Sequence, residues 1–316
     1  MLKIAENPIE SFTETDIGLV RRKNEDSFIL FVPDDEDLAA KKGVLAIVAD
    51  GVGGGNSGKT ASNLAVSVIR ERYYASSGDD PQRALRESLI AANREILAKA
   101  ASDRSMAGMA TTCTAFVMRG NQGFFSHAGD SRAYLFRRGA LRQLSEDHTL
   151  VNKLLKDGLI TDEAARNHPR RNIIVKALGG IEDLEPDSGQ LFLEGNDIIL
   201  LCSDGLHGPV SDGVIASTLT GLPLHEAGRS LVNQAKEGGG ADNITVVLLR
   251  VPVESDPKGN ATRPFRVESR KRKKAVLLAV FVALLVLAGG FFYIWTEAGF
   301  NKSEPADLDG LIKINK

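Results

Sequence analysis

The sequence predicts an α+β domain with antiparallel sheets, followed by one apolar segment that crosses a membrane. Strand-like runs linked in hairpins are separated by blocks of helical pattern, whereas a parallel sheet would need strands and helices in regular alternation. Residues 275–295 are uncharged and apolar over about 20 residues, the length that spans a bilayer as a helix. With 316 residues, 43% of them hydrophobic, the chain can bury the core of one large domain or two modest ones.

The predicted elements follow from the spacing of apolar residues. Strand-like runs come first, then two helical stretches, then three strands joined by the hairpin turns at 119–123 and 137–140. A helical region and an irregular insert lead to another strand, a pair of helices and a last strand. In chain order the elements are strands 11–20, 27–32 and 44–50, helices 58–75 and 82–101, strands 111–120, 122–130 and 132–144, a helix at about 148–157, the insert 158–180, strand 197–204, helices within 211–236 and strand 243–251.

The C-terminal region predicts a membrane anchor and its orientation. A buried core helix is the alternative for 275–295, but such helices are usually shorter and amphipathic, and this segment ends in a Tyr and Trp suited to a membrane interface. Seven basic residues lie between Arg263 and Lys274, whereas the tail 296–316 holds three lysines. The positive-inside rule therefore places the domain 8–252 and the linker 253–274 in the cytoplasm, with a single pass through the cytoplasmic (inner) membrane and the tail outside.

Charge and cysteine content exclude some functions. The region from residue 263 onward carries five more basic than acidic residues, so residues 1–262 have a net charge of −7, which argues against nucleic-acid binding. The N-terminus lacks the basic and apolar pattern of a secretory signal. Cys113 and Cys202 lie in apolar runs, as buried free thiols do, and indicate a reducing compartment.

Four apolar runs end in, or begin after, an aspartate beside small residues: Asp50 with Gly51, Asp130, Asp204 and Asp242. A carboxylate at the end of a rigid strand suits a pre-organised metal site, and ligation by oxygen alone selects Mg²⁺ or Mn²⁺. Each pair taken alone is more often an ordinary turn. Four together favour a cation site.

The segment GLVRRKNED at 18–26 adds Arg21, Glu25 and Asp26 ahead of a strand. An arginine beside a carboxylate and metal cluster can hold a phosphate through two parallel hydrogen bonds. On its own, the segment predicts only a surface loop.

Residues 53–60, GGGNSGKT, satisfy the phosphate-loop pattern and predict an alternative, a nucleotide hydrolase in which Asp204 binds Mg²⁺. That motif requires a parallel strand-helix-strand sheet, which this segment order does not supply. It also leaves Arg21, Glu25, Asp130 and Asp242 without a role. A third hypothesis is a degenerate domain that only binds a partner, although a carboxylate set that repels itself without metal argues for catalysis.

The motifs GLVRRKNEDS, VADGVGG with GKTAS, AGDSRAYLFR, CSDGL and GGADNITVV occur in an order and spacing that resemble the bacterial type 2C metal-dependent protein phosphatases. The resemblance covers roughly residues 11–250. It implies a four-layer α-β-β-α sandwich with two central antiparallel sheets. It also implies hydrolysis of phosphoserine and phosphothreonine in proteins by a water activated between two Mn²⁺ or Mg²⁺ ions, opposing a cognate Ser/Thr kinase in bacterial signalling.

The resemblance assigns roles to individual residues. Asp50 matches the aspartate that bridges both metals, and the Gly51 carbonyl matches a ligand of the second. Asp204 and Asp242 match ligands of the first metal, Glu25 and Asp26 match the pair that holds metal-bound waters, and Arg21 matches the phosphate-binding arginine. Asp130, with Asp204, matches a third, weaker metal site of bacterial members.

Two further segments carry expectations from the same resemblance. Residues 147–172, called the flap segment below, look like the family's mobile flap beside the active site. Val52 stands where eukaryotic relatives have a histidine proposed as general acid, so the group that protonates the leaving oxygen stays unassigned.

Overall fold

The computed structural model describes residues 3–4, 7–53, 56–166 and 168–253. Within this part of the chain, no helix combines the length and the apolar composition that a bilayer span requires. The predicted membrane segment 275–295 lies outside the described residues, and so do its whole basic flank and the tail.

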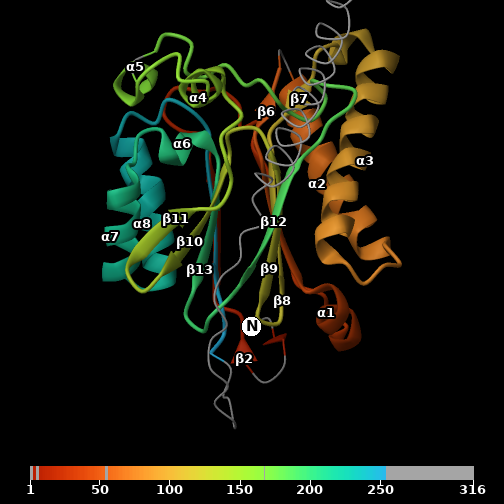
Figure 1. The fold of residues 1–316 in the computed structure, drawn as a ribbon, viewed down its shortest axis with the longest axis vertical. Helices are drawn as coiled ribbons and strands as arrows, with labels where there is room; N and C mark the ends of the chain where they lie inside the picture. Colours follow the sequence, from red (N-terminus) through yellow and green to blue (C-terminus); the bar gives the residue numbers. More distant parts are fainter. Residues whose placement is uncertain (1–2, 5–6, 54–55, 167, 254–316) are drawn as a thin grey trace, which may run out of the picture. The chain divides into compact units, whose positions relative to one another are not determined.

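Two antiparallel sheets of five strands each form the centre of the domain (Figure 1). The first has the order β11-β10-β13-β14-β3 and the second the order β12-β9-β8-β5-β4. The strands of the first sheet are β3 (Ser11–Asp16), β10 (Arg132–Arg137), β11 (Ala140–Gln143), β13 (Ile198–Cys202) and β14 (Ile244–Arg250). Those of the second are β4 (Ser27–Phe31), β5 (Val44–Ala49), β8 (Cys113–Arg119), β9 (Gln122–Ala128) and β12 (Asp187–Phe192). The short strands β1 (Lys3–Ile4) and β2 (Asn7–Pro8), and β6 (Gly51–Val52) and β7 (Ala110–Thr111), form separate pairs.

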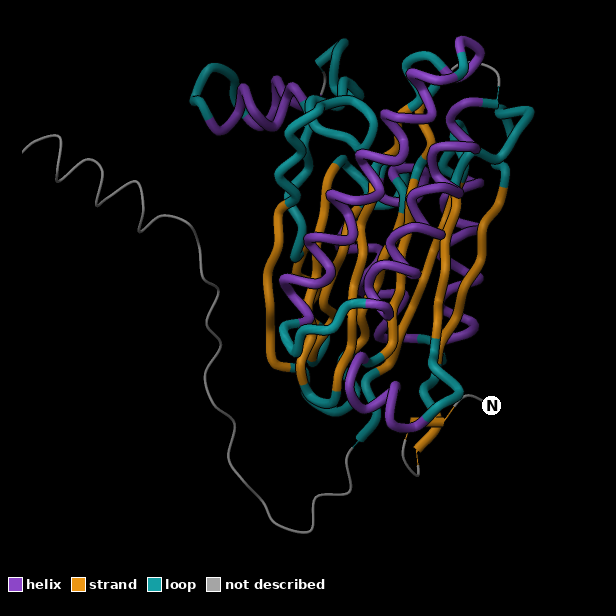
Figure 2. The backbone as a smooth tube through the Cα atoms, turned by 90° about the vertical axis from the view of Figure 1, so that its right-hand side faces the viewer, coloured by secondary structure: helices purple, strands orange, loops and turns teal. Residues whose placement is uncertain are grey.

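Helices cover the outer face of each sheet (Figures 1 and 2). The long helices α2 (Ser57–Ala75) and α3 (Pro81–Ser102) lie over the second sheet, while α7 (Asp212–Gly221) and α8 (Leu224–Glu237) lie over the first. The remaining helices are α1 (Glu36–Lys42), the 3-10 turn Arg104–Met106, α4 (Leu150–Lys156), α5 (Asp162–Arg166) and α6 (Asp204–His207).

The apolar strands bury both faces because each sheet has a partner on both sides. In β5, Leu45 and Ile47 pack against α2 and α3, whereas Val44, Ala46 and Val48 face the other sheet. Strand β14 divides its side chains in the same way between α8 and the space between the sheets. Successive side chains of a strand point to opposite faces, so a continuous apolar run is the pattern that a central strand requires.

The α+β fold with two antiparallel sheets is confirmed, and the four layers implied by the resemblance are present. Strand β5 pairs antiparallel with both β4 and β8, which contradicts the parallel sheet that a phosphate-loop enzyme needs. The strand that was predicted over residues 11–20 is β3, and it ends at Asp16. Gly18 lies at φ +80° and accepts no side chain, because an added Cβ would stand 2.2 Å from the Asp242 carbonyl oxygen.

Strand β12 and helices α1 and α5 are among the elements that the pattern analysis missed. Strand β12 is an edge strand with only Leu191 buried, so its alternation of apolar and polar residues is weak. Helix α1 buries Ala39 alone. Helix α5 lies inside the insert expected to be irregular and is five residues long. Each is short or nearly all exposed, and apolar periodicity signals only elements that bury one face.

Candidate functional site

The predicted site residues gather at the end of the sandwich where α4, α6 and β6 lie (Figure 1). Asp50 directly follows β5, and Asp204 is the first residue of α6 after β13. Asp242 stands just before β14, and Asp130 lies in the turn between β9 and β10. Antiparallel pairing brings the end of one strand beside the start of its neighbour, which explains how carboxylates from distant segments meet.

Electrostatic interactions show that these side chains are close together. Arg21 donates from Nη2 to Asp242 Oδ2 at 2.7 Å, and the charges of Asp50 and Asp204 also raise the arginine pKa. Burial raises the pKa of Asp50 well above its usual value, and four other carboxylates add to the shift: Asp26, Asp204, Asp130 and Asp242.

The buried carboxyl groups resist ionisation. Burial raises the pKa of Asp26 to about 7, although hydrogen bonds from Thr245 and Ser203 oppose the shift. Burial, helped by the charge of Asp204, raises the pKa of Asp130 to about 7. Burial and the charge of Asp242 raise the pKa of Asp204 to about 6. A cation among these groups would relieve both the loss of hydration and the mutual repulsion.

Unpartnered oxygens test whether the residues fit a metal. In the part of the chain that the structure describes, four buried carboxylate oxygens have no hydrogen-bond partner: Glu25 Oε1, Asp26 Oδ1, Asp130 Oδ1 and Asp204 Oδ1. Buried polar atoms without partners are rare, and hard divalent cations prefer such oxygens. Among the described residues, no three Asp, Glu, His or Cys side chains are already spaced as a metal shell. The donor set, which consists of oxygens alone, fits Mg²⁺ or Mn²⁺.

The backbone around Asp50 is held by two threonines and a glycine contact. The Asp50 N–H donates to Thr112 Oγ1 at 3.0 Å, and its carbonyl accepts from the Thr111 hydroxyl at 2.8 Å. A Cβ on Gly51 would stand 2.2 Å from the Gly58 carbonyl oxygen in the first turn of α2. The GKT motif therefore serves close packing of α2 on the strand that carries Asp50.

The acidic pair before β4 is oriented by groups from the first sheet and from α2. Asp26 Oδ2 accepts from Ser203 Oγ at 2.8 Å and from Thr245 Oγ1 at 2.6 Å. Lys59 donates to the Asp26 carbonyl and lies near Ser27 Oγ. In a phosphate-loop enzyme this lysine would contact the nucleotide phosphates, whereas here it binds a backbone carbonyl of the same chain.

Asn243, to which the sequence analysis gave no role, holds the loop between β3 and β4, the loop that contains Arg21. Its Nδ2 donates to the carbonyls of Ile17 (2.9 Å) and Lys23 (3.0 Å), and its Oδ1 accepts from the Glu25 N–H at 2.9 Å. The loop between β3 and β4 is thereby docked on the residue that follows Asp242. Only the fact that Asn243 follows a site aspartate hinted at this in the sequence.

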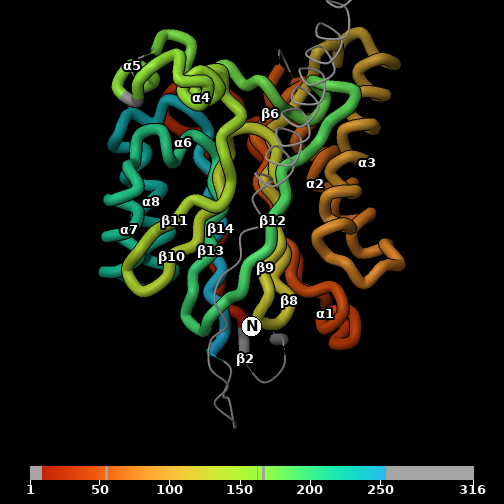
Figure 3. Tube along the Cα trace, in the orientation of Figure 1, coloured from red at the N-terminus to blue at the C-terminus, as the bar shows by residue number. Residues whose placement is uncertain are grey.

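A cavity of about 600 Å³ adjoins the carboxylates. Its wall includes Asp130, Asp204 and Asp242 on one side and residues of the flap segment on the other, among them Thr149, Arg171 and Asn172. Figure 3 shows α4 and α5 at the same end of the domain as α6. The cavity is large enough to receive a phosphorylated side chain with part of its backbone.

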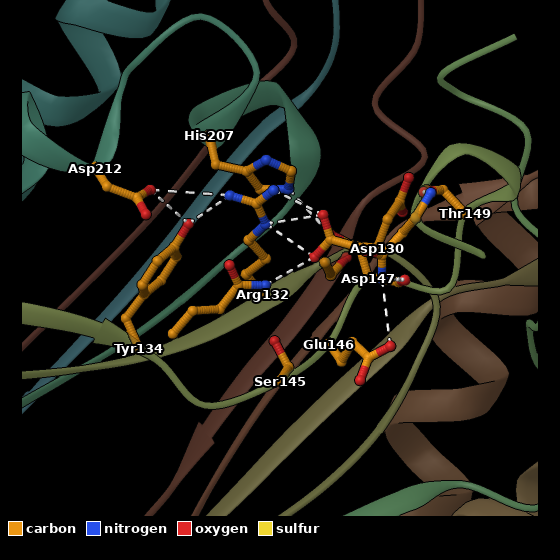
Figure 4. Close-up of polar contacts among 12 residues, drawn as sticks. Asp130, Arg132, Tyr134, Ser145, Glu146, Asp147, Thr149, His207 and Asp212 are labelled. Atoms are coloured by element: carbon orange, nitrogen blue, oxygen red, sulfur yellow. Dashed lines mark hydrogen bonds and ion pairs between the residues drawn. The ribbon is translucent and has the colours of Figure 1, made fainter. Parts of the chain in front are cut away.

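A network of charged residues supports the cavity wall (Figure 4). Arg132 binds both oxygens of Asp147 through Nε and Nη2, at 2.7–3.1 Å, and donates from Nη1 to Tyr134 OH at 2.8 Å. Tyr134 in turn donates to Asp212 at 3.0 Å. The first residue of the flap segment is therefore tied to β10 by a two-pronged ion pair.

The structure brings all the predicted site residues to one end of the domain, while their assignment as metal ligands stays a prediction. Glu25 lies against α2, since its Oε1 would stand 2.8 Å from a Cβ on Gly58. Val52 is exposed beside Gly51 and supplies no proton donor. The sequence analysis did not identify the residues that orient the site through the hydrogen bonds described above. These are Thr111, Thr112, Ser203, Asn243 and Thr245.

Comparisons with known proteins agree with this geometry. The family model described as Protein phosphatase 2C matches residues 24–235. A serine/threonine phosphatase of Listeria monocytogenes serovar 1/2a is 37% identical over 240 residues, which cover 74% of this chain and 93% of that protein. The crystal structure of the Mycobacterium tuberculosis phosphatase PstP superposes with a TM-score of 0.69 at 36% identity, covering 77% of this chain and 99% of that one. A PstP catalytic domain in complex with two manganese ions has a TM-score of 0.67 at 35% identity, covering 77% and 98%.

Proposed function

The chain belongs to the protein phosphatase 2C family, and from that premise we propose how its own residues serve the hydrolysis of phosphoserine and phosphothreonine in proteins. It is a metal-dependent Ser/Thr protein phosphatase of bacterial signalling, and its family uses Mn²⁺ or Mg²⁺. The observation that carries the proposal is the convergence of buried carboxylates with four unpartnered oxygens.

Six carboxylates and one backbone carbonyl would hold the metals: Asp50, Asp204, Asp242, Glu25, Asp26, Asp130 and the Gly51 carbonyl. The bound ions supply a Lewis acid that lowers the pKa of water and neutralises charge on the phosphoryl group. Asp50 lies among the other carboxylates and is held by Thr111 and Thr112, which suits the bridging position.

Arg21 would bind the phosphoryl oxygens. Its guanidinium is already oriented by Asp242, and half of the side chain is exposed, so a substrate can reach it. Two parallel N–H donors match two phosphate oxygens better than the single ammonium group of a lysine would. The negative charge of the phosphate and the positive charge of Arg21 are thus brought together at the mouth of the carboxylate cluster.

The nucleotide-hydrolase alternative lacks support in the same region. Its phosphate-loop lysine, Lys59, donates to the Asp26 carbonyl, and the strand before it lies in an antiparallel sheet. The partner-binding alternative leaves the four unpartnered carboxylate oxygens without an explanation.

The test is a substrate comparison on the purified full chain. We expect release of phosphate from a phosphothreonine peptide in the presence of Mn²⁺, no release in EDTA, and no hydrolysis of ATP at the same enzyme concentration. Hydrolysis of ATP with no action on the phosphopeptide would support the nucleotide hydrolase instead. Mn²⁺ binding without hydrolysis of either substrate would favour the partner-binding domain.

We further propose that a single transmembrane helix at 275–295 anchors the catalytic domain to the cytoplasmic face of the cytoplasmic membrane, and that a Ser/Thr kinase is its opposing partner. The apolar length of the segment and its basic flank support the anchor. In fractionated cells, the full chain is expected with membranes after a carbonate wash, whereas a chain truncated after residue 262 is expected in the soluble fraction. Release of the full chain by carbonate would contradict the anchor.

A further inference from the structure

At His148, the start of the flap segment pairs with the residues that directly follow its end. The His148 backbone carbonyl accepts from the Val175 N–H at 2.8 Å, and the next residues continue the ladder, since Leu150 N–H donates to the Ile173 carbonyl at 2.8 Å. The His148 N–H donates to the Gly129 carbonyl at 2.7 Å. The base of the flap segment is therefore closed on itself and joined to the turn between β9 and β10.

The imidazole of His148 makes a second bond to the same glycine. Nδ1 accepts from the Gly129 N–H at 3.1 Å, so the proton of the neutral ring lies on Nε2. Nε2 stands 3.3 Å from Asp187 Oδ2 on β12, and Asp187 also binds Lys176 at 2.6 Å. Both backbone polar groups of Gly129 are thus used by His148, and the opposite edge of the ring reaches the strand that follows the flap segment.

The ring has little freedom to rotate. It stacks on His127, with ring centroids 4.9 Å apart and planes 23° from parallel. His127 is fully buried and is held through Nδ1 near Thr114 Oγ1 (2.8 Å) and through Nε2 to the Glu146 carbonyl (3.0 Å). The side chain of His148 is 11% exposed. Stacking and burial therefore fix the direction in which Nδ1 points.

Gly129 immediately precedes Asp130. Its φ is +122°, and an added Cβ would stand 2.4 Å from the Thr112 Cβ, so this position requires glycine. The Asp130 carbonyl accepts from His207 Nε2 at 2.9 Å, and the Asp130 carboxylate keeps one oxygen without a partner. The ring of His148 holds the peptide before Gly129 and its backbone N–H holds the Gly129 carbonyl, so both contacts bear on the backbone that leads into Asp130.

We propose that His148 is a positioning residue that couples the base of the flap segment to the Asp130 carboxylate, an inference that rests on the proposed metal-dependent function. Through Nδ1 it holds the N–H of Gly129, the residue before the Asp130 that would bind a cation, and through Nε2 and Asp187 it links that contact to Lys176, just beyond the end of the flap segment. A residue that only fills space would affect folding stability without a specific effect on cation affinity.

Three substitutions separate these roles. His148→Asn places an amide oxygen near the position of Nδ1 and retains the acceptor for the Gly129 N–H, whereas His148→Gln extends toward Asp187 and leaves that N–H unpaired. His148→Ala removes both contacts. Lys176→Gln is the matched control, because it breaks the ion pair with Asp187 but does not touch Gly129.

Mn²⁺ binding to the full chain is measured by calorimetric titration, alongside the melting temperature and the kinetics on a phosphothreonine peptide. Loss of a residue that orients a ligand typically weakens metal binding by about 10–100-fold. We expect such weakening of the Asp130-dependent Mn²⁺ site in His148→Gln and His148→Ala, and recovery to within about 3-fold of wild type in His148→Asn. Lys176→Gln is expected to raise KM for the peptide and to leave Mn²⁺ affinity unchanged.

The proposal would be overturned if the three His148 variants all bound Mn²⁺ with the same affinity as one another. Failure of His148→Asn to recover affinity, when its melting temperature matches that of His148→Gln, would overturn it too. The test also distinguishes this proposal from the proposed function. A wild-type chain that binds Mn²⁺ without hydrolysing the peptide would refute the phosphatase assignment, while the binding data would still decide the role of His148.

Discussion

Asp50→Asn is expected to lower Mn²⁺-dependent hydrolysis of a phosphothreonine peptide by at least about 10³-fold, the upper end of what loss of one charge-stabilising group costs. Asp50 has the carboxyl most strongly surrounded by others, with the charges of four neighbouring aspartates raising its pKa. An amide there removes a charge that would face both cations. The backbone contacts with Thr111 and Thr112 do not involve the side chain and are retained.

The fold of Asp50→Asn should be intact, which separates a catalytic effect from unfolding. In EDTA we expect its melting temperature to equal or exceed that of the wild type, because one member of a self-repelling cluster is gone. Asp34→Asn is the matched control, since Asp34 is an exposed carboxylate outside the site, and its activity should be unchanged. Wild-type activity in Asp50→Asn would show that the site assignment is wrong.

The sequence predicted the central layers because they obey simple periodicity. Strands β5 and β13 are apolar throughout and β14 is mostly apolar, and each ends or begins within two residues of an aspartate, so both the sheets and the carboxylates could be located. Helices α1 and α5 and strand β12 could not, because they bury few side chains or are too short to show a period.

The orienting residues were missed for a different reason. Asn243 binds the Ile17 carbonyl across 226 positions of sequence, and Thr245 binds Asp26 across 219. Local patterns contain no information about such pairs, since polar residues near strand ends are also typical of turns. His148 belongs to the segment that was expected to be a mobile flap, yet its ring stacks on the buried His127.

The metal-free protein is expected to lose stability as pH rises from about 6.5 to 8. Burial raises the pKa of Asp26 and Asp130 to about 7, above the value near 4 of an unfolded carboxyl. In this window the folded chain binds more protons than the unfolded chain, so the free energy of unfolding falls with rising pH. Each such group contributes about 0.8 kcal/mol over the window, and Asp50 adds to the same trend.

Two buried histidines oppose the carboxylates at acidic pH, which is why the expected loss of stability begins near pH 6.5. Burial lowers the pKa of His127 and of His207 to about 4, so below pH 6.5 the unfolded chain takes up protons that the folded chain does not. Their contribution makes stability rise with pH and opposes the carboxylates in the acid range. At pH 6.5 each of these histidines is still half protonated in the unfolded chain, so between pH 6.5 and 8 each offsets about 0.4 kcal/mol of the loss, and the carboxylates set the sign of the net slope.

Thermal melts in EDTA at pH 6.5, 7.2 and 8.0 should therefore show a fall of at least roughly 2–4 °C, for a net loss of about 1 kcal/mol in a domain of this size. Saturating Mn²⁺ should reverse the sign, because cation binding requires the ionised carboxylates and strengthens as they lose protons. Asp130→Asn should flatten the slope in EDTA by the share of one group. A metal-free melting temperature that stays level or rises across this window would mean that the carboxyl groups are ionised in the folded protein without a cation, and the case for a built metal site would fail with it.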